Sequence, residues 1–151
     1  MALETILLAV GASDEGRLEK LAEAAADIAG PAGATVALAH VFSTDEYEQA
    51  RENLDFDPDS EVTPDVIARR YLTIRELSDA MDDAGVEYTE HGRLADEDAV
   101  GEGIVALAED VGADLVVIGG RERSPAGKAV FGSTAQEVLL NASCPVTFIR
   151  E

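Results

Sequence analysis

The sequence predicts an α/β fold in which helices cover both faces of a five-stranded parallel sheet, a Rossmann-like arrangement. Short apolar runs rich in β-branched residues, typical of strands buried on both faces, alternate with longer stretches of helical periodicity. Glycine stands where three of the helical stretches are expected to end. The length, 151 residues, suits a single domain, residues 1–151, with a full hydrophobic core.

The first part of the chain predicts a strand, a helix and a second strand. Glu4 to Val10 is a nearly continuous apolar run, and Thr35 to Val41 is another. Between them, Ser13 in the Gly11–Ser13 turn is placed to cap a helix, which Gly30-Pro31 is expected to end. A strand, a helix and a strand within about 40 residues form a right-handed βαβ unit.

The middle of the chain is less regular. Ser43 to Val62 is rich in acidic residues, and Glu46 to Leu54 within it is a candidate short helix. We interpret the stretch either as a solvated loop or as a lid over a site at the end of the second strand. Thr63-Pro64, a cap followed by proline at the first helical position, predicts a long helix that ends at Gly85. Val86 to Glu90 is then expected to form a third strand at a sheet edge.

The last part of the chain predicts two more strands and two more helices. Apolar residues at helical spacing predict a helix over 100–111, which the following glycine ends. Residues 115–118 form an apolar run and predict the fourth strand. A helix is expected to begin at Ser133, which has the form of a capping box with the glutamine three residues later. Val146 to Ile149 predicts the last strand, at an edge because a proline precedes it.

The segment between the fourth strand and the last helix has the architecture of a phosphate-binding site. The strand leads into Gly119-Gly120, a polar loop and the start of a helix, where free N–H groups and the helix dipole favour an anion. Three of the 11 basic residues of the chain, Arg121, Arg123 and Lys128, fall in this loop. The alternative is that these cations pair with neighbouring carboxylates, including that of Glu122.

This segment resembles the signature of the universal stress protein family, G-x-x-G-x9-G-[ST] after the fourth strand. Gly119, Glu122, Gly132 and Ser133 occupy the signature positions, so a glutamate replaces the second glycine. The resemblance extends over nearly the whole chain, and it implies the strand order 3-2-1-4-5. In that order strands one and four lie side by side, and the crevice at their carboxyl ends is the general ligand site of such sheets.

The resemblance further implies that an adenine nucleotide, ATP with or without magnesium, binds in this crevice. We expect the nucleotide to contact residues of the first, second and fourth strands and of the phosphate loop: Ala9, Val10, Gly11, Ser13, Val41, Ile118, Gly119, Arg121, Glu122, Arg123, Lys128, Gly132, Ser133 and Thr134. Two of these positions depart from the family pattern. Gly11 replaces an aspartate that helps to hold the nucleoside, and Glu122 places an anion in the phosphate loop. These departures leave open a second interpretation, a nucleotide-independent interaction module of the same family.

Efficient catalysis is not expected, because no constellation of nucleophile, base and orienting residue is visible. Ser133 does not lie in a G-x-S-x-G turn. His40 and His91 have no cysteine or carboxylate beside them at ligand spacing, so packed or exposed histidines are expected in place of a metal site. Together with this absence, the resemblance implies a stress-response binding module rather than an enzyme.

The charge of the chain indicates its environment. Thirty-one acidic residues against 11 basic ones give a formal charge of −20, and only two lysines occur. Such a chain repels itself at low salt, whereas at 1 M salt the Debye length falls to about 3 Å. This composition favours a halophile cytoplasm over an acidic mesophile protein, and it argues against binding to nucleic acid. A cytoplasmic location without membrane association is expected, because neither a signal peptide nor an apolar run of about 20 residues is visible.

The last strand offers a surface for assembly. Val146, Thr147, Phe148 and Ile149 are expected at the sheet edge, where unpaired N–H and C=O groups can bind another chain. Universal stress proteins commonly dimerise through this strand, so the resemblance also implies a homodimer. A two-fold axis would pair each last strand antiparallel with its copy. The alternative is a monomer whose own helix covers this edge.

Overall fold

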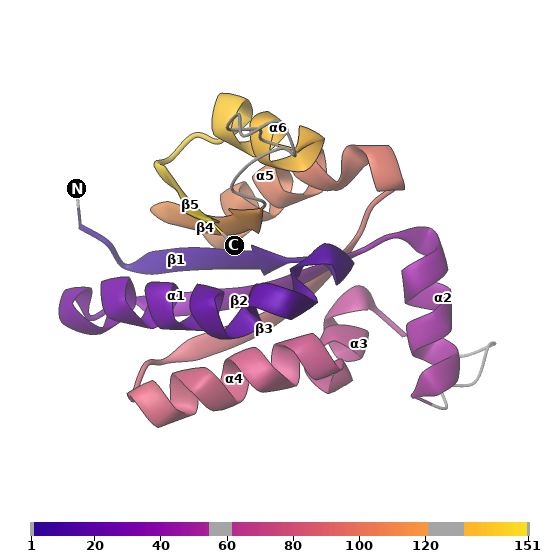
Figure 1. Cartoon of the computed structure of the whole chain (residues 1–151), viewed down its shortest axis with the longest axis horizontal. Helices are drawn as coiled ribbons and strands as arrows, with labels where there is room; N and C mark the ends of the chain where they lie inside the picture. Colours follow the sequence, from indigo (N-terminus) through magenta and orange to yellow (C-terminus); the bar gives the residue numbers. More distant parts are fainter. Residues whose placement is uncertain (1, 55–61, 121–131, 151) are drawn as a thin grey trace.

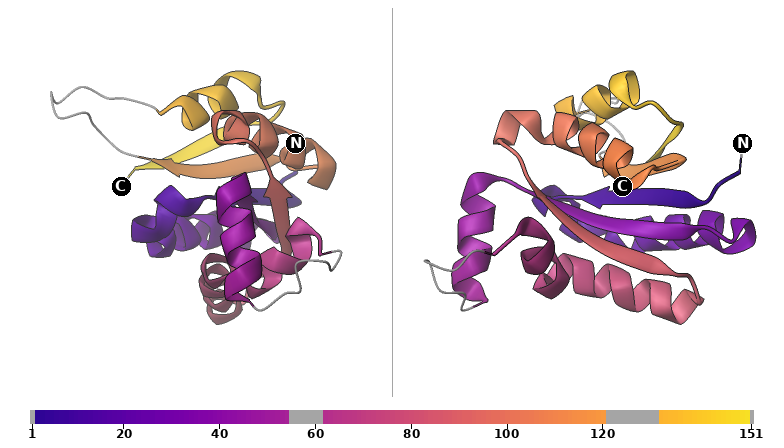
Figure 2. Two further views of the ribbon diagram at one scale, coloured as in Figure 1. Left: turned by 90° about the vertical axis from the view of Figure 1, so that its right-hand side faces the viewer. Right: turned by 180° about the vertical axis from the view of Figure 1, so that it is seen from behind.

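The computed structural model describes residues 2–54, 62–120 and 132–150. Its centre is a five-stranded sheet of order β3-β2-β1-β4-β5, in which all neighbouring strands are parallel. The expected α/β class and the strand order 3-2-1-4-5 are therefore confirmed. Helices α1 and α4 lie on one face of the sheet, and α5 and α6 lie on the other (Figures 1 and 2).

The strands lie close to their predicted positions. They are β1 (Thr5–Val10), β2 (Thr35–Phe42), β3 (Tyr88–Leu94), β4 (Leu115–Gly120) and β5 (Val146–Arg150). The largest difference is at β3, which begins later than expected and continues to Leu94, because it pairs in register with β2 as far as Phe42. The edge strands β3 and β5 are half-buried, whereas β1 and β2 are almost completely buried. The predicted edge positions are thus confirmed.

Alternating side chains of the central strands supply two separate cores. In β1, Ile6, Leu8 and Val10 pack with residues of α1 and α4, whereas Leu7 and Ala9 pack with residues of α5 and α6. A strand that is apolar on both faces can be buried only between two helical layers. This is why the sequence of β1 is a nearly continuous apolar run.

The first long helix, α1 (Leu18–Ala32), does not end at Gly30-Pro31, so that prediction is wrong. Gly30 has no Cβ to collide with the proline ring that follows it, and it therefore keeps a helical conformation. Pro31 lies in the last turn, and the helix ends at Gly33, which has a φ of 68°. There the Ala34 N–H donates to the Ala29 carbonyl oxygen over 3.0 Å, which closes the turn.

The predicted long helix after Thr63-Pro64 is in fact two helices, α3 (Pro64–Arg70) and α4 (Leu72–Ala84). The Thr63 cap is confirmed, because its hydroxyl accepts the Val66 N–H over 3.4 Å. The helix breaks at Tyr71, whose φ and ψ of −74° and 140° are extended. The break is explained by tertiary packing. The centroid of the Tyr71 ring lies 4.7 Å from that of His40 and 5.1 Å from that of Phe42.

The remaining helices frame the carboxyl ends of the strands. Helix α2 (Thr44–Asn53) confirms a helix within the irregular acidic stretch, and residues 55–61 lie outside the described residues. Helix α5 (Val100–Val111) follows a short 3-10 turn, Glu97–Ala99, and ends as predicted before a glycine. No helix among the described residues is long and apolar enough to cross a membrane.

The last helix, α6 (Ser133–Asn141), begins without the predicted capping box. Gly132 occupies the cap position, and it has no side chain that could accept a hydrogen bond from the helix. Ser133 stands one residue too late for the expected role, and the Gln136 N–H donates to the Gly132 carbonyl oxygen over 3.0 Å. The first turn of α6 therefore keeps its backbone N–H groups without a side-chain acceptor from its own cap.

Helix α3 covers one edge of the sheet. The carboxylate of Asp65, in its first turn, accepts the Gly92 N–H of β3 over 2.9 Å. A Cβ at Gly92 would lie 2.9 Å from the Ala68 Cβ and against the Pro64 carbonyl group, so only glycine allows this close approach. Helix α3 thus covers the outer edge of β3 at Gly92, and β5 forms the other edge of the sheet.

We predict that Gly92→Ala lowers the free energy of unfolding by about 1–3 kcal/mol, because the added methyl group has no space between β3 and α3. Urea denaturation checks this value. Gly16→Ala is the matched control: a Cβ at Gly16 meets nothing within 4 Å, so its effect should stay within about 0.5 kcal/mol. Equal stability of the two variants would contradict the packing described here.

Candidate functional site

A cavity of about 860 Å³ opens at the carboxyl ends of β1 and β4, where the winding of the sheet reverses. The structure places around it the expected site residues that it describes: Ala9, Val10, Gly11, Ser13, Val41, Ile118, Gly119, Gly132, Ser133 and Thr134. The other four, Arg121, Glu122, Arg123 and Lys128, lie outside the described residues. The strand order explains the grouping, because β1 and β4 are neighbours and their following loops meet at one end of the sheet.

The start of α6 forms one end of the cavity. Gly132, Ser133 and Thr134 all line it, so the first-turn N–H groups and the positive end of the helix dipole lie at its wall. Among the described residues, a Cβ at Gly132 would meet nothing within 4 Å apart from its neighbours along the chain. This end of the cavity is suited to an anion.

The turn after β1 is organised by Asp14, which the sequence analysis did not single out. One carboxylate oxygen of Asp14 accepts the Gly11 N–H over 2.8 Å, and the other accepts the Arg17 Nε–H over 2.7 Å. Asp14, and not Ser13, therefore fastens this turn, so the Ser13 cap was wrong. The turn is a 3-10 helix, Ala12–Arg17. The sequence pattern that indicates it is an aspartate three residues after the cap position at Gly11.

Arg17 brings a cation to the cavity beside Gly119. It lines the cavity, and its side chain is only 10% exposed. A Cβ at Gly119 would lie 3.0 Å from Arg17 Nε, so the glycine makes room for the guanidinium group. The first signature glycine thus has a packing role in addition to the backbone turn proposed from the sequence.

A buried polar network lies behind the cavity wall near the end of β2, and of its members only Glu46 lines the cavity. The His40 ring is fully buried, with Nε2 3.0 Å from Glu46 Oε1 and Nδ1 2.8 Å from Thr73 Oγ1. Because a carboxylate only accepts, His40 donates from Nε2 to Glu46, and in the neutral imidazole Nδ1 then accepts from the Thr73 hydroxyl. The expectation of a packed histidine is confirmed, whereas its carboxylate partner was missed.

This network holds helix α2 and does not form a catalytic triad. The Thr73 hydroxyl, the His40 imidazole and the Glu46 carboxylate are hydrogen-bonded one to the next, as in a triad. Thr73 is only 4% exposed, however, so no substrate reaches its oxygen. Tyr71 adds a contact from its hydroxyl to Glu46 Oε2 at 3.4 Å. Burial, and then the nearby Glu46 carboxylate, raise the pKa of Tyr71 to about 12, so its hydroxyl remains protonated and can donate at neutral pH.

Part of the cavity wall is apolar. It comes from β1, β2, β4 and α5, with the side chains of Val10, Val41, Ile118, Val100 and Ile104. A flat apolar ring system can be buried between such walls, whereas polar groups at the two ends fix its orientation. The cavity therefore suits a ligand that has an anionic group at one end and a planar apolar part.

Comparisons with known proteins decide the family. The model of the Universal stress protein family matches residues 2–150. The chain belongs to the universal stress protein family. No curated protein matches the sequence significantly.

Solved universal stress proteins share the fold along nearly the whole chain. One from Archaeoglobus fulgidus is 26% identical with a TM-score of 0.70, and the match covers 99% of this chain and 100% of that one. A structure of the Archaeoglobus fulgidus protein in complex with dAMP has 26% identity and a TM-score of 0.65, with the same coverage. A universal stress protein in complex with cAMP has 21% identity and a TM-score of 0.67, covers 99% of this chain and 98% of that one, and supports the fold alone.

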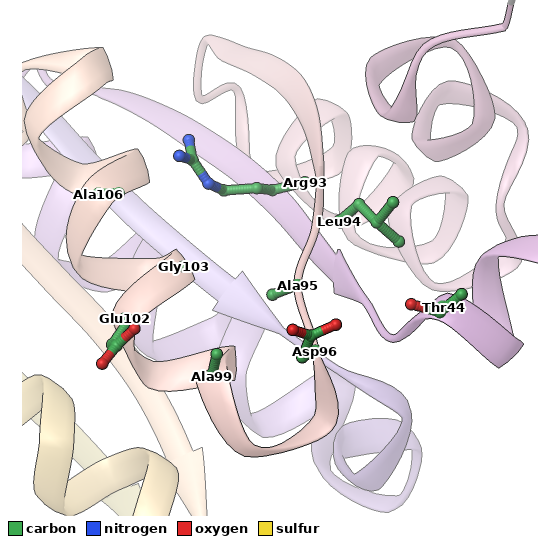
Figure 3. Close-up of a pocket in the computed structure, with 9 residues that line it drawn as sticks. All are labelled: Thr44, Arg93, Leu94, Ala95, Asp96, Ala99, Glu102, Gly103 and Ala106. Atoms are coloured by element: carbon green, nitrogen blue, oxygen red, sulfur yellow. The ribbon is translucent and has the colours of Figure 1, made fainter.

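This universal stress protein has a second, smaller hollow of about 470 Å³ beside the end of β3 (Figure 3). It is lined by Thr44, Arg93, Leu94, Ala95, Asp96, Ala99, Glu102, Gly103 and Ala106. The Arg93 guanidinium donates to Asp110 over 2.9 Å, and two carboxylates, those of Asp96 and Glu102, also border the hollow. This hollow is therefore a weaker candidate for an anion than the cavity at α6. Among residues 2–54, 62–120 and 132–150, no group of three histidine, cysteine or acidic residues could hold a metal ion.

Proposed function

We propose that this universal stress protein binds an adenine nucleotide, ATP, in the cavity at the carboxyl ends of β1 and β4, and that it acts as a binding module rather than an efficient enzyme. One observation carries the proposal: the first turn of α6 and a set of apolar side chains line the same cavity. Helix N-termini bind phosphate through their free N–H groups, and apolar walls bind a planar base. Magnesium would accompany ATP as a counter-ion of its phosphates.

A relative supports an adenine nucleotide as the ligand class: the Archaeoglobus fulgidus protein that is 26% identical to this chain was solved with dAMP. The cavity volume of about 860 Å³ lies within the range of about 300–1,000 Å³ that is usual for small-molecule sites.

Gly11 supports a second candidate, a nucleotide-independent interaction module. Where the family pattern has an aspartate for the nucleoside, this chain has Gly11, and the carboxylate of Asp14, three residues later, already accepts from the Gly11 N–H and from Arg17. A sugar in the cavity would have to be held by backbone groups or by other side chains. The two candidates differ in whether ATP stabilises the protein.

The working environment that we propose is a salt-rich cytoplasm. A formal charge of −20 on 151 residues produces strong self-repulsion, which molar salt screens. Salt would also reduce the repulsion between the acidic surface and a triphosphate. Binding experiments on this protein therefore belong in molar KCl.

We predict that Gly132→Val abolishes most of the stabilisation by ATP, because the side chain would fill the space at the start of α6 where a phosphate would lie. Thermal shift in molar KCl with magnesium measures it: ATP at 100 times its Kd adds about 2.7 kcal/mol to the wild-type protein. Gly16→Val, also with nothing within 4 Å of its Cβ and outside the cavity, is the matched control. No shift of the wild-type protein at millimolar ATP would favour the second candidate.

We also propose that the protein is a homodimer through β5. The Val116 N–H donates to the Pro145 carbonyl oxygen over 3.0 Å, and Val116 is paired with Val146 in register. Because backbone groups alternate in direction along a parallel ladder, those of Val146 and Phe148 face away from β4. Two copies can pair these outward groups antiparallel around a two-fold axis.

Thr147→Asp is expected to convert the dimer to a monomer, because like charges would face each other near the two-fold axis. Thr147 suits this test better than Phe148, whose ring fills the space beside Gly120. Light scattering in molar KCl should give twice 15.9 kDa for the wild-type chain and for the control Thr147→Val, and 15.9 kDa for Thr147→Asp. A wild-type monomer would refute the dimer.

A further inference from the structure

Glu46 lies at the end of the cavity opposite to the start of α6. It stands in the first turn of α2, directly after β2, and it lines the same cavity as Val41 and Ser43. Helix α6 follows β4, and β1 separates β2 from β4 in the sheet. The carboxylate and the helix N-terminus therefore border different ends of one cavity.

The Glu46 carboxylate is held in a fixed position. Its Oε1 accepts the Nε2–H of the fully buried His40 over 3.0 Å, and its Oε2 lies 3.4 Å from the Tyr71 hydroxyl. The Ser43 hydroxyl accepts the Glu46 N–H over 3.2 Å, which fixes the backbone as well. The side chain remains 14% exposed. A carboxylate oxygen has more than one lone pair, so it can accept a further hydrogen bond from the cavity.

The charges at the two ends orient an anionic ligand. A phosphate is favoured at α6 by the helix dipole, and it is disfavoured beside Glu46 because like charges repel. A nucleotide bound with its phosphates at α6 would extend its base past the apolar walls toward Val41 and Glu46. The Glu46 carboxylate, which borders the cavity there, accepts hydrogen bonds and cannot donate them.

We propose that Glu46 is a specificity-determining residue that selects a base with an amino group at the edge facing α2, as adenine has, over a base with a carbonyl oxygen there. This inference rests on the proposed function and specifies its ligand. An adenine 6-amino group donates to the Glu46 carboxylate. The 6-oxo group of hypoxanthine would place an acceptor against the carboxylate where adenine places a donor.

The test compares ATP with inosine triphosphate, which differs in this part of the base, by calorimetry in molar KCl with magnesium. The wild-type protein should bind ATP about tenfold or more tightly than inosine triphosphate, because a hydrogen bond to a charged group is lost. Glu46→Gln should bring the ratio close to one, because an amide can both donate and accept. Glu48→Gln removes the same charge from an exposed position of α2, and it should keep the wild-type ratio.

The outcomes separate this inference from the proposed function. Equal affinity of the wild-type protein for the two nucleotides would overturn the role of Glu46 and leave nucleotide binding established. A ratio that Glu46→Gln does not change would also overturn it, provided that the variant melts as cooperatively as the wild-type chain. If neither nucleotide binds to the wild-type protein, the proposed function fails, and this inference fails with it.

Discussion

Strand β1 is bonded to a parallel strand on each side, to β2 and to β4, and the winding of the chain reverses across it. Its side chains alternate between two cores, so β1 can be buried only if α1 and α4 cover one face and α5 and α6 cover the other. At the same reversal, the segments that follow β1 and β4 lie at one end of the sheet and border the cavity. Fold and candidate site thus depend on the position of one strand.

Several carboxylates of this strongly acidic chain accept hydrogen bonds from backbone N–H groups. Asp14 accepts the Gly11 N–H, and Asp65 accepts the Gly92 N–H. Asp114 accepts the N–H groups of both Glu4 and Thr5, and these bonds hold the pKa of its carboxyl group below the usual value. A lowered pKa stabilises the fold above the ordinary carboxyl pKa, and this contribution is lost as the pH falls through the lowered value. Part of the acidity therefore serves the structure directly, beyond its effect on solubility in salt.

The sequence predicts the strands and their order because apolar runs and the family signature are local patterns. It does not predict the break at Tyr71, since the rings that Tyr71 packs against belong to β2 and become its neighbours only in the folded chain. The same is true of the site. Strand ends and the start of α6 are visible as motifs, and ten expected residues line one cavity, but the Glu46–His40 contact requires the helix α2 to turn back toward β2. Asp14 was detectable by its spacing from Gly11, whereas Arg17 beside Gly119 was not.

The central claim is that one cavity has a phosphate end at α6 and a base end at α2. A crystal structure of the full chain grown with ATP and magnesium from molar KCl tests it most directly. We predict phosphate oxygens within hydrogen-bond distance of the N–H groups in the first turn of α6, and the adenine ring between the apolar walls with its amino group at Glu46. A nucleotide bound in the reverse direction, or a cavity that stays empty at saturating ATP, would contradict it.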